Sequence, residues 1–192
     1  MKTRKRIFVA VNLPDKIKEK LIGYQSQWNE IPANWTKKEN LHITLSFLGY
    51  LADEDLPDVL VATEKVAAKA ESFSVVLDKI CYGPKGKNPP RMIWATGESE
   101  ELSNLQRELE KSLIFSIEGD ETKINQSKKN TIHVTLARIR QWDFRRIDPE
   151  ESPIIDNDIA ISFPVNSVDI MESVLKKGGP KYIVLESYSL EH

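Results

Sequence analysis

The chain contains nearly the same ten-residue stretch twice, at residues 36–45 and 127–136, and the second copy follows 91 residues after the first. The two copies align without a gap, with five identical positions and three conservative exchanges. The chain has 192 residues, so this offset is about half of its length. A repeat that occurs only twice, at so long a period, does not fit a solenoid. It predicts two related halves that face each other.

Each copy ends in a strand pattern that carries one histidine and one threonine. Residues 41–47 and 132–136 alternate apolar and polar side chains and are rich in β-branched residues, which is typical of a β-strand. Side chains two residues apart on a strand project from the same face. His42 and Thr44 are therefore predicted to share a face, as are His133 and Thr135. If the two halves face each other, two imidazoles and two hydroxyls line one cleft.

The duplication decides how these histidines are interpreted. A single histidine on a strand is more often a packed or solvated side chain than a catalytic one. Here two of the chain's three histidines occupy the same frame with matching flanks, which packing alone does not explain. We therefore interpret His42 and His133 as a paired functional site.

Composition places the chain among ordinary globular proteins. Hydrophobic residues make up 40% of it and the net charge is −2, which excludes a long nucleic-acid-coating surface but leaves room for a small basic patch. Cys81 is the only cysteine, so we expect no intrachain disulfide and a reducing compartment. No apolar run is long enough to span a bilayer, and the basic start followed by Pro14 and Asp15 does not fit a signal peptide. These features predict a cytoplasmic protein with no membrane contact.

Hydrophobic periodicity predicts alternating strands and helices. Such an order predicts an α+β fold with antiparallel sheets. No Pro-, Gly- or Ser-rich linker marks independent domains, so residues 1–192 are predicted to form a single domain. The predicted strands lie near 7–13, 41–48, 73–82, 91–96, 132–136, 165–175 and 182–190, and the predicted helices near 15–28, 58–72 and 100–117.

The residue types favour acid–base chemistry without a metal. Two imidazoles that flank one atom can act as base and acid, because imidazole titrates near neutral pH. Thr44 and Thr135 could donate hydrogen bonds to an oxyanion, such as a phosphate between the histidines. Cys81 has no supporting pattern for a His–Cys nucleophile, and two histidines without a neighbouring carboxylate motif make a weak zinc site. We therefore expect no metal and no cofactor.

Four lysines precede the histidines and allow two interpretations. They could form a rim that attracts an anion, or they could be solvated loop charges, and we favour the second. They are Lys37, Lys38, Lys128 and Lys129.

The doubled motif resembles that of a known superfamily. His42-Ile43-Thr44-Leu45 and His133-Val134-Thr135-Leu136 are similar to the paired His-x-Thr-hydrophobic motifs of the 2H phosphoesterases. The segments 6–14, 40–49, 91–95, 133–138 and 171–182 resemble the RNA 2′,3′-cyclic phosphodiesterase branch, also called the 2′-5′ RNA ligase family. The chain departs from that branch at Tyr50 and at Thr131-Ile132, which bears on loop shape rather than on the motif residues.

The resemblance implies a fold and an activity. The fold would be bilobal α+β, with two antiparallel sheets related by a pseudo-two-fold axis, helices outside and a central cleft. The activity would be metal-independent hydrolysis of a terminal 2′,3′-cyclic phosphate on RNA, or on cyclic nucleotides, to a 2′-phosphomonoester by a monomer. His133 would take the proton from water and His42 would protonate the departing 3′ oxygen, while Thr44 and Thr135 hold the non-bridging oxygens.

Other residues and activities stay open at this point. The resemblance also suggests Arg138 as a phosphate ligand, but strand alternation counts against it unless the strand ends or bulges before it. Phe8, Phe47, Trp35 and Trp94 could stack a base, although core packing is the better interpretation of each. The same site could instead run as a ligase that forms a 2′-5′ bond, or the chain could bind RNA or nucleotides without turnover. Product analysis separates the first alternative, and affinity without hydrolysis would favour the second.

Overall fold

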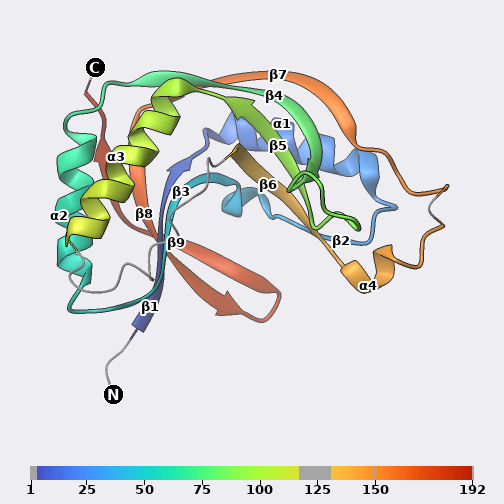
Figure 1. Cartoon of the computed structure of the whole chain (residues 1–192), viewed down its shortest axis with the longest axis horizontal. Coiled ribbons are helices and arrows are strands. Elements are labelled where there is room, and N and C mark those ends of the chain that lie inside the picture. The colour runs from blue at the N-terminus through green and yellow to red at the C-terminus, as the bar shows by residue number, and fades with distance from the viewer. Residues whose placement is uncertain (1–3, 117–130, 149, 192) are drawn as a thin grey trace.

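The computed structural model describes residues 4–116, 131–148 and 150–191 (Figure 1). Strands dominate and alternate with a few helices along the chain. In order the elements are β1 Arg4–Asn12, α1 Asp15–Gln25, η1 Ser26–Trp28, β2 Ala33–Trp35, η2 Lys38–Asn40, β3 His42–Ala52, α2 Leu56–Ala67, β4 Phe73–Gly83, β5 Met92–Glu98, α3 Glu100–Ser116, β6 Ile132–Ile139, α4 Gln141–Phe144, β7 Asp156–Val165, β8 Ser167–Lys176 and β9 Gly179–Ser189.

The strands pair in the order β7-β4-β5-β6-β3-β1-β8-β9, and β2 also pairs with β6. Pairing between these strands is antiparallel throughout, which confirms the predicted α+β class. The prediction of two separate sheets is wrong, because the pair Ile43–Val134 joins β3 to β6 and makes one sheet. The joint is one residue pair long because β2 occupies the edge of β6 beyond it, from Ala137 to Ile139.

Each long helix packs on strands from the other part of the chain. α1 follows β1 but contacts β6, whereas α3 follows β5 and contacts β3 together with its neighbour α2 (Figure 1). The apolar face of α3 is buried at helical spacing, through Leu102, Leu105, Leu109 and Leu113. Truncating a leucine so placed to alanine costs about 2–5 kcal/mol of stability. Among the helices of the described ranges, none is long and apolar enough to cross a membrane.

β3 runs past the glycine at which it was predicted to end. Ile7 pairs with Gly49 and Phe8 with Phe47, so Leu48 is an extra residue in β3 and the strand continues to Ala52. Gly49 has a φ of 70°, a conformation that glycine adopts at little cost. The glycine therefore marks a β-bulge rather than the end of the strand.

Two elements near the C-terminal part were not predicted. α4 lies directly after β6, where no helix was predicted. β7 was missed although its alternate side chains Ile159, Ile161, Phe163 and Val165 are buried. Pro164 breaks the strand pattern in the sequence, yet β7 pairs only with β4 and so lies at the sheet edge, where proline is tolerated.

Candidate active site

The two motif strands lie next to each other in the middle of the sheet. His42 and Thr44 are partly exposed while Ile43 and Leu45 are buried, and β6 repeats this alternation at His133 to Leu136. The predicted facing is therefore confirmed for both strands. All five predicted site residues line a single cleft of about 680 Å³, which opens between the motif strands and the β8–β9 hairpin. They are His42, Thr44, His133, Thr135 and Arg138.

The two imidazoles are held in the same way. Nδ1 of His42 lies 2.7 Å from the carbonyl oxygen of Asn40, and Nδ1 of His133 lies 2.7 Å from that of Thr131. A carbonyl oxygen only accepts, so Nδ1 carries the proton in each ring and the lone pair of the neutral ring is on Nε2. Nε2 of His42 accepts a hydrogen bond of 2.9 Å from the hydroxyl of Thr44.

Aromatic rings pack around both histidines. His42 contacts Phe8 at 5.0 Å between ring centroids and the edge of Tyr182 at 5.2 Å. His133 stacks on Trp94 with centroids 4.0 Å apart and an interplanar angle of 24°. These apolar surroundings keep water from the rings, so burial raises the cost of a positive charge on either imidazole.

The pKa values of the histidines follow from this packing. The pKa of His42 is lowered to about 4, mainly by burial. The nearby His133, Lys18 and Arg138 add to this effect, and the hydrogen bond to Asn40 opposes it. Burial also lowers the pKa of His133, and the positive charge of Arg138 lowers it as well. Both rings are therefore neutral near pH 7 in the free protein. An anion bound between them would favour their protonated forms.

A β-bulge in each motif strand resets the alternation after the threonine. On β3, Val9 pairs with Ser46 and Ala10 with Thr44, so Leu45 is an extra residue. On β6 the pairs Ile93–Ala137 and Trp94–Thr135 make Leu136 the extra residue in the same way. Two buried residues then follow each threonine in succession.

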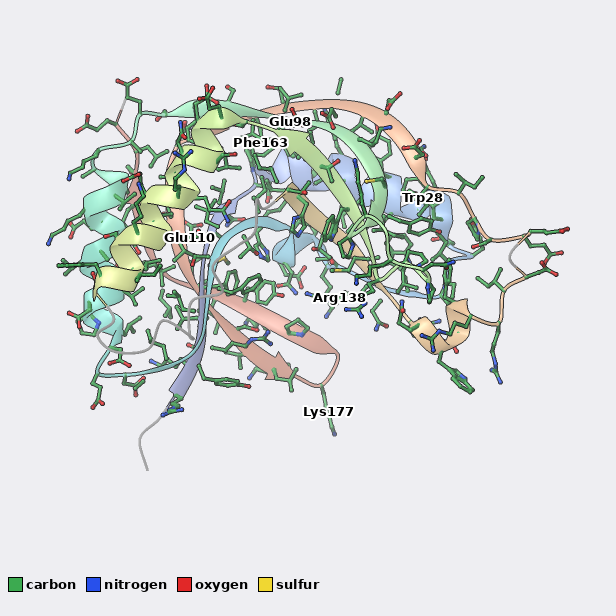
Figure 2. The ribbon with its side chains drawn as sticks, viewed as in Figure 1. Trp28, Glu98, Glu110, Arg138, Phe163 and Lys177 are labelled. Carbon is green, nitrogen blue, oxygen red and sulfur yellow. The ribbon has the colours of Figure 1, made fainter. Side chains whose placement is uncertain are left out.

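The bulge decides the position of Arg138. Strand alternation alone would turn Arg138 away from His133, but the extra Leu136 returns it to the cleft, where Figure 2 shows it on β6. Its Nη1 lies 3.7 Å from the sulfur of Met92. Phe47 occupies the matching place on β3 and is 49% exposed, so the expectation that it packs in the core is wrong.

Two glutamines donate hydrogen bonds to the bulged leucines. Nε2 of Gln106 on α3 lies 2.8 Å from the carbonyl oxygen of Leu45, and Nε2 of Gln25 on α1 lies 3.1 Å from that of Leu136. Gln25 also donates to the carbonyl oxygen of Thr36, and the backbone N–H of Thr36 donates to the carbonyl oxygen of Leu136. A bulge disrupts strand pairing locally, so these amides satisfy backbone groups at the point where the cleft residues are set.

The β8–β9 hairpin contributes residues that the sequence did not single out. Asn40, which holds His42 through its carbonyl, donates its side-chain amide to the carbonyl of Pro180 at 2.8 Å. This contact fixes the hairpin beside the first motif and places Tyr182 against His42. Nothing in the local pattern of these residues indicates the contact, because 140 residues separate its two partners.

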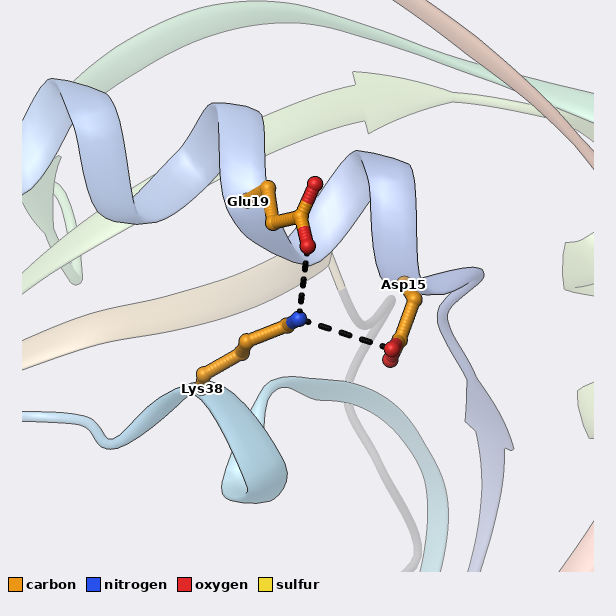
Figure 3. A network of polar contacts seen from close by, with 3 residues as sticks. All are labelled: Asp15, Glu19 and Lys38. Carbon is orange, nitrogen blue, oxygen red and sulfur yellow. Dashed lines mark hydrogen bonds and ion pairs between the residues drawn. The ribbon is translucent and has the colours of Figure 1, made fainter.

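The lysines before the histidines are not brought into the cleft as a group. Lys38 extends from η2 to α1, where its Nζ lies 2.9 Å from Glu19 and 3.4 Å from Asp15 (Figure 3). Its charge is therefore balanced on the surface, in agreement with the interpretation as solvated charge. Lys128 and Lys129 lie outside the described residues.

The cleft lacks the donor set of a metal centre. In residues 4–116, 131–148 and 150–191 no three His, Cys, Asp or Glu side chains are grouped so that they could hold a metal ion. The groups that meet in the cleft include hydrogen-bond donors, proton carriers and the guanidinium groups of Arg6 and Arg138. Such a set suits a phosphate anion.

Comparisons with known proteins agree with this geometry. The family model described as LigT like Phosphoesterase matches residues 11–94. An RNA 2′,3′-cyclic phosphodiesterase of Thermus thermophilus is 29% identical over 192 residues, covering 96% of this chain and 90% of that protein. A crystal structure of a protein from the same species matches with a TM-score of 0.83 at 29% identity, covering 96% and 97% of the two chains. The fold is also that of E. coli LigT complexed with 3′-AMP, with a TM-score of 0.78 at 20% identity over 98% and 99% of the chains. The chain is therefore similar to LigT-like phosphoesterases over residues 11–94, and to a protein named RNA 2′,3′-cyclic phosphodiesterase over most of its length.

Proposed function

We propose that this enzyme hydrolyses the terminal 2′,3′-cyclic phosphate of RNA, or of a cyclic nucleotide, to a 2′-phosphomonoester. One observation carries the proposal: His42, His133, Thr44, Thr135 and Arg138 line one cleft. A relative that is 29% identical over most of its length bears the name RNA 2′,3′-cyclic phosphodiesterase. An anionic ester that is cleaved by proton transfer fits this set of side chains.

In the proposed reaction the two histidines move protons at opposite ends of one displacement. Nε2 of His133 takes a proton from water, whose oxygen forms a new bond to phosphorus. The bond from phosphorus to the 3′ oxygen breaks, and His42 gives that oxygen the proton on its Nε2. The product keeps phosphate on the 2′ oxygen and gains a free 3′ hydroxyl. Both Nε2 atoms are available for this chemistry because both Nδ1 atoms bond to backbone carbonyls.

The hydroxyls and Arg138 would hold the phosphate. Thr44 donates to His42 before substrate binds, and its hydroxyl can rotate to a non-bridging oxygen once His42 is protonated. Thr135 and Arg138 approach from β6, where a guanidinium can donate two parallel hydrogen bonds to a phosphate. We infer no metal in this scheme, and saturating EDTA is expected to leave the turnover rate unchanged.

We also propose that residues 1–192 act as one bilobal domain with a pseudo-two-fold relation between the motif strands. Three features support the relation, each repeated at an offset of 91 residues: the carbonyl that holds the histidine, the bulged leucine and the residue that re-enters the cleft. We expect the active species to be a monomer, because all five proposed site residues lie on one chain.

The test is hydrolysis of each 2′,3′-cyclic mononucleotide, with the 2′ and 3′ products separated. Replacing His42 or His133 by alanine should lower kcat by about 10²–10⁴-fold, the usual contribution of one acid–base group. The matched control is His192→Ala, which removes the chain's third histidine and leaves both motifs intact. Unchanged turnover by the His133→Ala enzyme, or a 3′-phosphate product, would contradict the mechanism.

A further inference from the structure

Basic side chains gather at one end of the cleft although the chain as a whole is slightly acidic. The β4–β5 connection, residues 84–91, carries three basic residues and no acidic one. Residues 138–146 at the end of β6 and in α4 carry four arginines and the single acidic residue Asp143. All seven basic side chains are exposed. Leaving Arg138 to the catalytic cleft, we call the other six the cationic rim: Lys85, Lys87, Arg91, Arg140, Arg145 and Arg146.

Backbone and side-chain contacts hold the two segments of the cationic rim together. Nε2 of Gln141 on α4 donates to the carbonyl of Pro90 at 2.5 Å, and the N–H of Ile139 donates to the carbonyl of Arg91 at 2.9 Å. Asp143 accepts a bond of 2.7 Å from Nε of Arg140 and so offsets one of the charges. The remaining five cations therefore lie on two segments that these contacts join.

The cationic rim is continuous with the cleft. Met92 pairs with Arg138, and both line the cleft between the histidines. Lys85 lines an adjoining cavity of about 510 Å³ that shares Trp94 and His133 with the cleft. That cavity also has two acidic residues, Asp78 in the middle of β4 and Glu98 at the end of β5 away from the β4–β5 connection. The positive charge of these two segments thus lies where the chain leaves the cleft toward α4, in addition to Arg6, which lines the cleft from β1.

An exposed aromatic ring belongs to the same surface. Trp142 on α4 is 70% exposed, and the guanidinium of Arg146 lies 5.3 Å from the centre of its ring. Large exposed aromatics next to cations are the features by which proteins bind single-stranded nucleic acid, since the ring stacks a base and the cations contact phosphates. A surface made only for solubility would not place a tryptophan there.

We propose that the cationic rim and Trp142 bind the RNA chain on the 5′ side of its cyclic phosphate end, which makes oligonucleotides better substrates than mononucleotides. This inference rests on the proposed function, because the cleft then holds the terminal nucleotide and the preceding phosphates extend over the rim. A cyclic mononucleotide has no such phosphates and cannot reach it. The rim acts on substrate affinity and not on the chemical step.

The test compares two substrates with the same reacting group. One is a 2′,3′-cyclic mononucleotide, and the other is a single-stranded RNA of about eight nucleotides that ends in the same cyclic nucleotide. The variants are the double changes Arg145→Ala with Arg146→Ala and Lys85→Ala with Lys87→Ala. The matched control changes two exposed lysines on and just after α2, Lys65→Ala with Lys69→Ala, at the opposite end of the molecule from α4 (Figure 1).

For each rim variant, we expect kcat/KM on the oligonucleotide to fall about tenfold or more while kcat/KM on the mononucleotide stays within about twofold. Each lost phosphate contact should also reduce the slope of log kcat/KM against log salt by about 0.7 for the single strand. Trp142→Leu should weaken oligonucleotide turnover and Trp142→Phe should restore it. Equal losses on both substrates, or a loss as large in the α2 control, would overturn the proposal.

Binding separates this proposal from the proposed activity. The 2′-phosphate form of the same oligonucleotide, labelled at its 5′ end, is titrated and followed by fluorescence anisotropy. If the wild-type protein hydrolyses neither substrate, the proposed function fails, and the binding data still decide the rim. Affinity that is unchanged in the Arg145–Arg146 variant would refute the rim, and affinity that drops in this variant but not in the α2 control supports it.

Discussion

The packing of the two histidines predicts that kcat/KM falls as the pH rises through neutrality. In the proposed mechanism the reactive free enzyme carries a proton on His42 and none on His133. Burial lowers the pKa of His42 to about 4 and also lowers the pKa of His133 from its ordinary value of 6.5. The pH dependence of kcat/KM reports the ionisations of the free enzyme. Both pKa values obtained from the kcat/KM profile should therefore lie below 6.5.

The size of the effect follows from the pKa of His42. With a pKa of about 4, this ring is protonated in roughly one molecule in a thousand at about pH 7. Above the higher of the two pKa values, kcat/KM should therefore drop about tenfold for each pH unit, or about 100-fold over two units. The profile of kcat should lie at higher pH, because the bound phosphate is an anion and favours the protonated ring.

The assay measures initial rates on a 2′,3′-cyclic mononucleotide at constant ionic strength, from about pH 4.5 to about pH 8.5, across the range in which histidines titrate. The cyclic phosphodiester keeps a single negative charge throughout, so its own titration does not distort the profile. Ring proton shifts in NMR spectra of the His192→Ala protein give the two pKa values directly. A level kcat/KM between neutral and mildly alkaline pH, or a pKa above 6.5 for His42, would refute the reasoning.

Three further predictions concern the residues around the histidines. Gln106→Leu removes the amide that bonds to the bulge in β3 and should cost about 1–3 kcal/mol by urea denaturation, with a lower kcat. Gln25→Leu should cost a similar amount, because the Leu136 carbonyl keeps its bond from the N–H of Thr36 but the Thr36 carbonyl loses its donor; an unchanged stability in either variant would contradict this. Arg138→Met should lower kcat/KM on a cyclic mononucleotide about 10–100-fold, the value of one charged hydrogen bond, and an unchanged value would remove Arg138 from the phosphate site. The pKa of His42 in the folded protein is below its value in the unfolded chain, so its contribution to stability is complete above pH 6.5 and is lost as the pH falls toward about 4. Acidification should therefore lower the free energy of unfolding of the wild-type protein by about 3 kcal/mol more than that of His42→Asn. An identical decrease in the two proteins would contradict the low pKa.

The sequence predicts the motif strands well because their period is short and local. His42 and Thr44 face the cleft for the reason that any strand turns alternate side chains to one side, and the same rule holds for His133 and Thr135. The α3 helix is equally readable, since its leucines recur at helical spacing. In these elements the local pattern and the tertiary structure agree.

Arg138 shows where a local rule stops. Regular strand alternation from His133 would place Arg138 on the face away from the cleft. The extra residue Leu136 shifts the alternation and returns Arg138 to the cleft. The bulge depends on the partner strand β5, and Gln25, separated by 111 residues, bonds to its carbonyl. No window around Arg138 contains that information. The same holds for Tyr182, which reaches His42 through a hairpin fixed by Asn40.

The bulges also explain how a duplicated strand can serve an asymmetric reaction. Two identical strands would give each end of the phosphate the same surroundings, whereas attack by water and departure of a ribose oxygen are different tasks. The residue that re-enters the cleft is Phe47 on β3 and Arg138 on β6, so the two motif strands supply an apolar ring and a guanidinium to the same cleft. The bulge in each strand follows the histidine and the threonine, so it exposes the position of Phe47 or Arg138 without moving them. The side chain at this position can therefore differ between the two strands while the two histidines keep equivalent positions. Exchanging the two, with Phe47→Arg and Arg138→Phe, should therefore leave both histidine ring contacts intact but move one guanidinium of the cleft from β6 to β3.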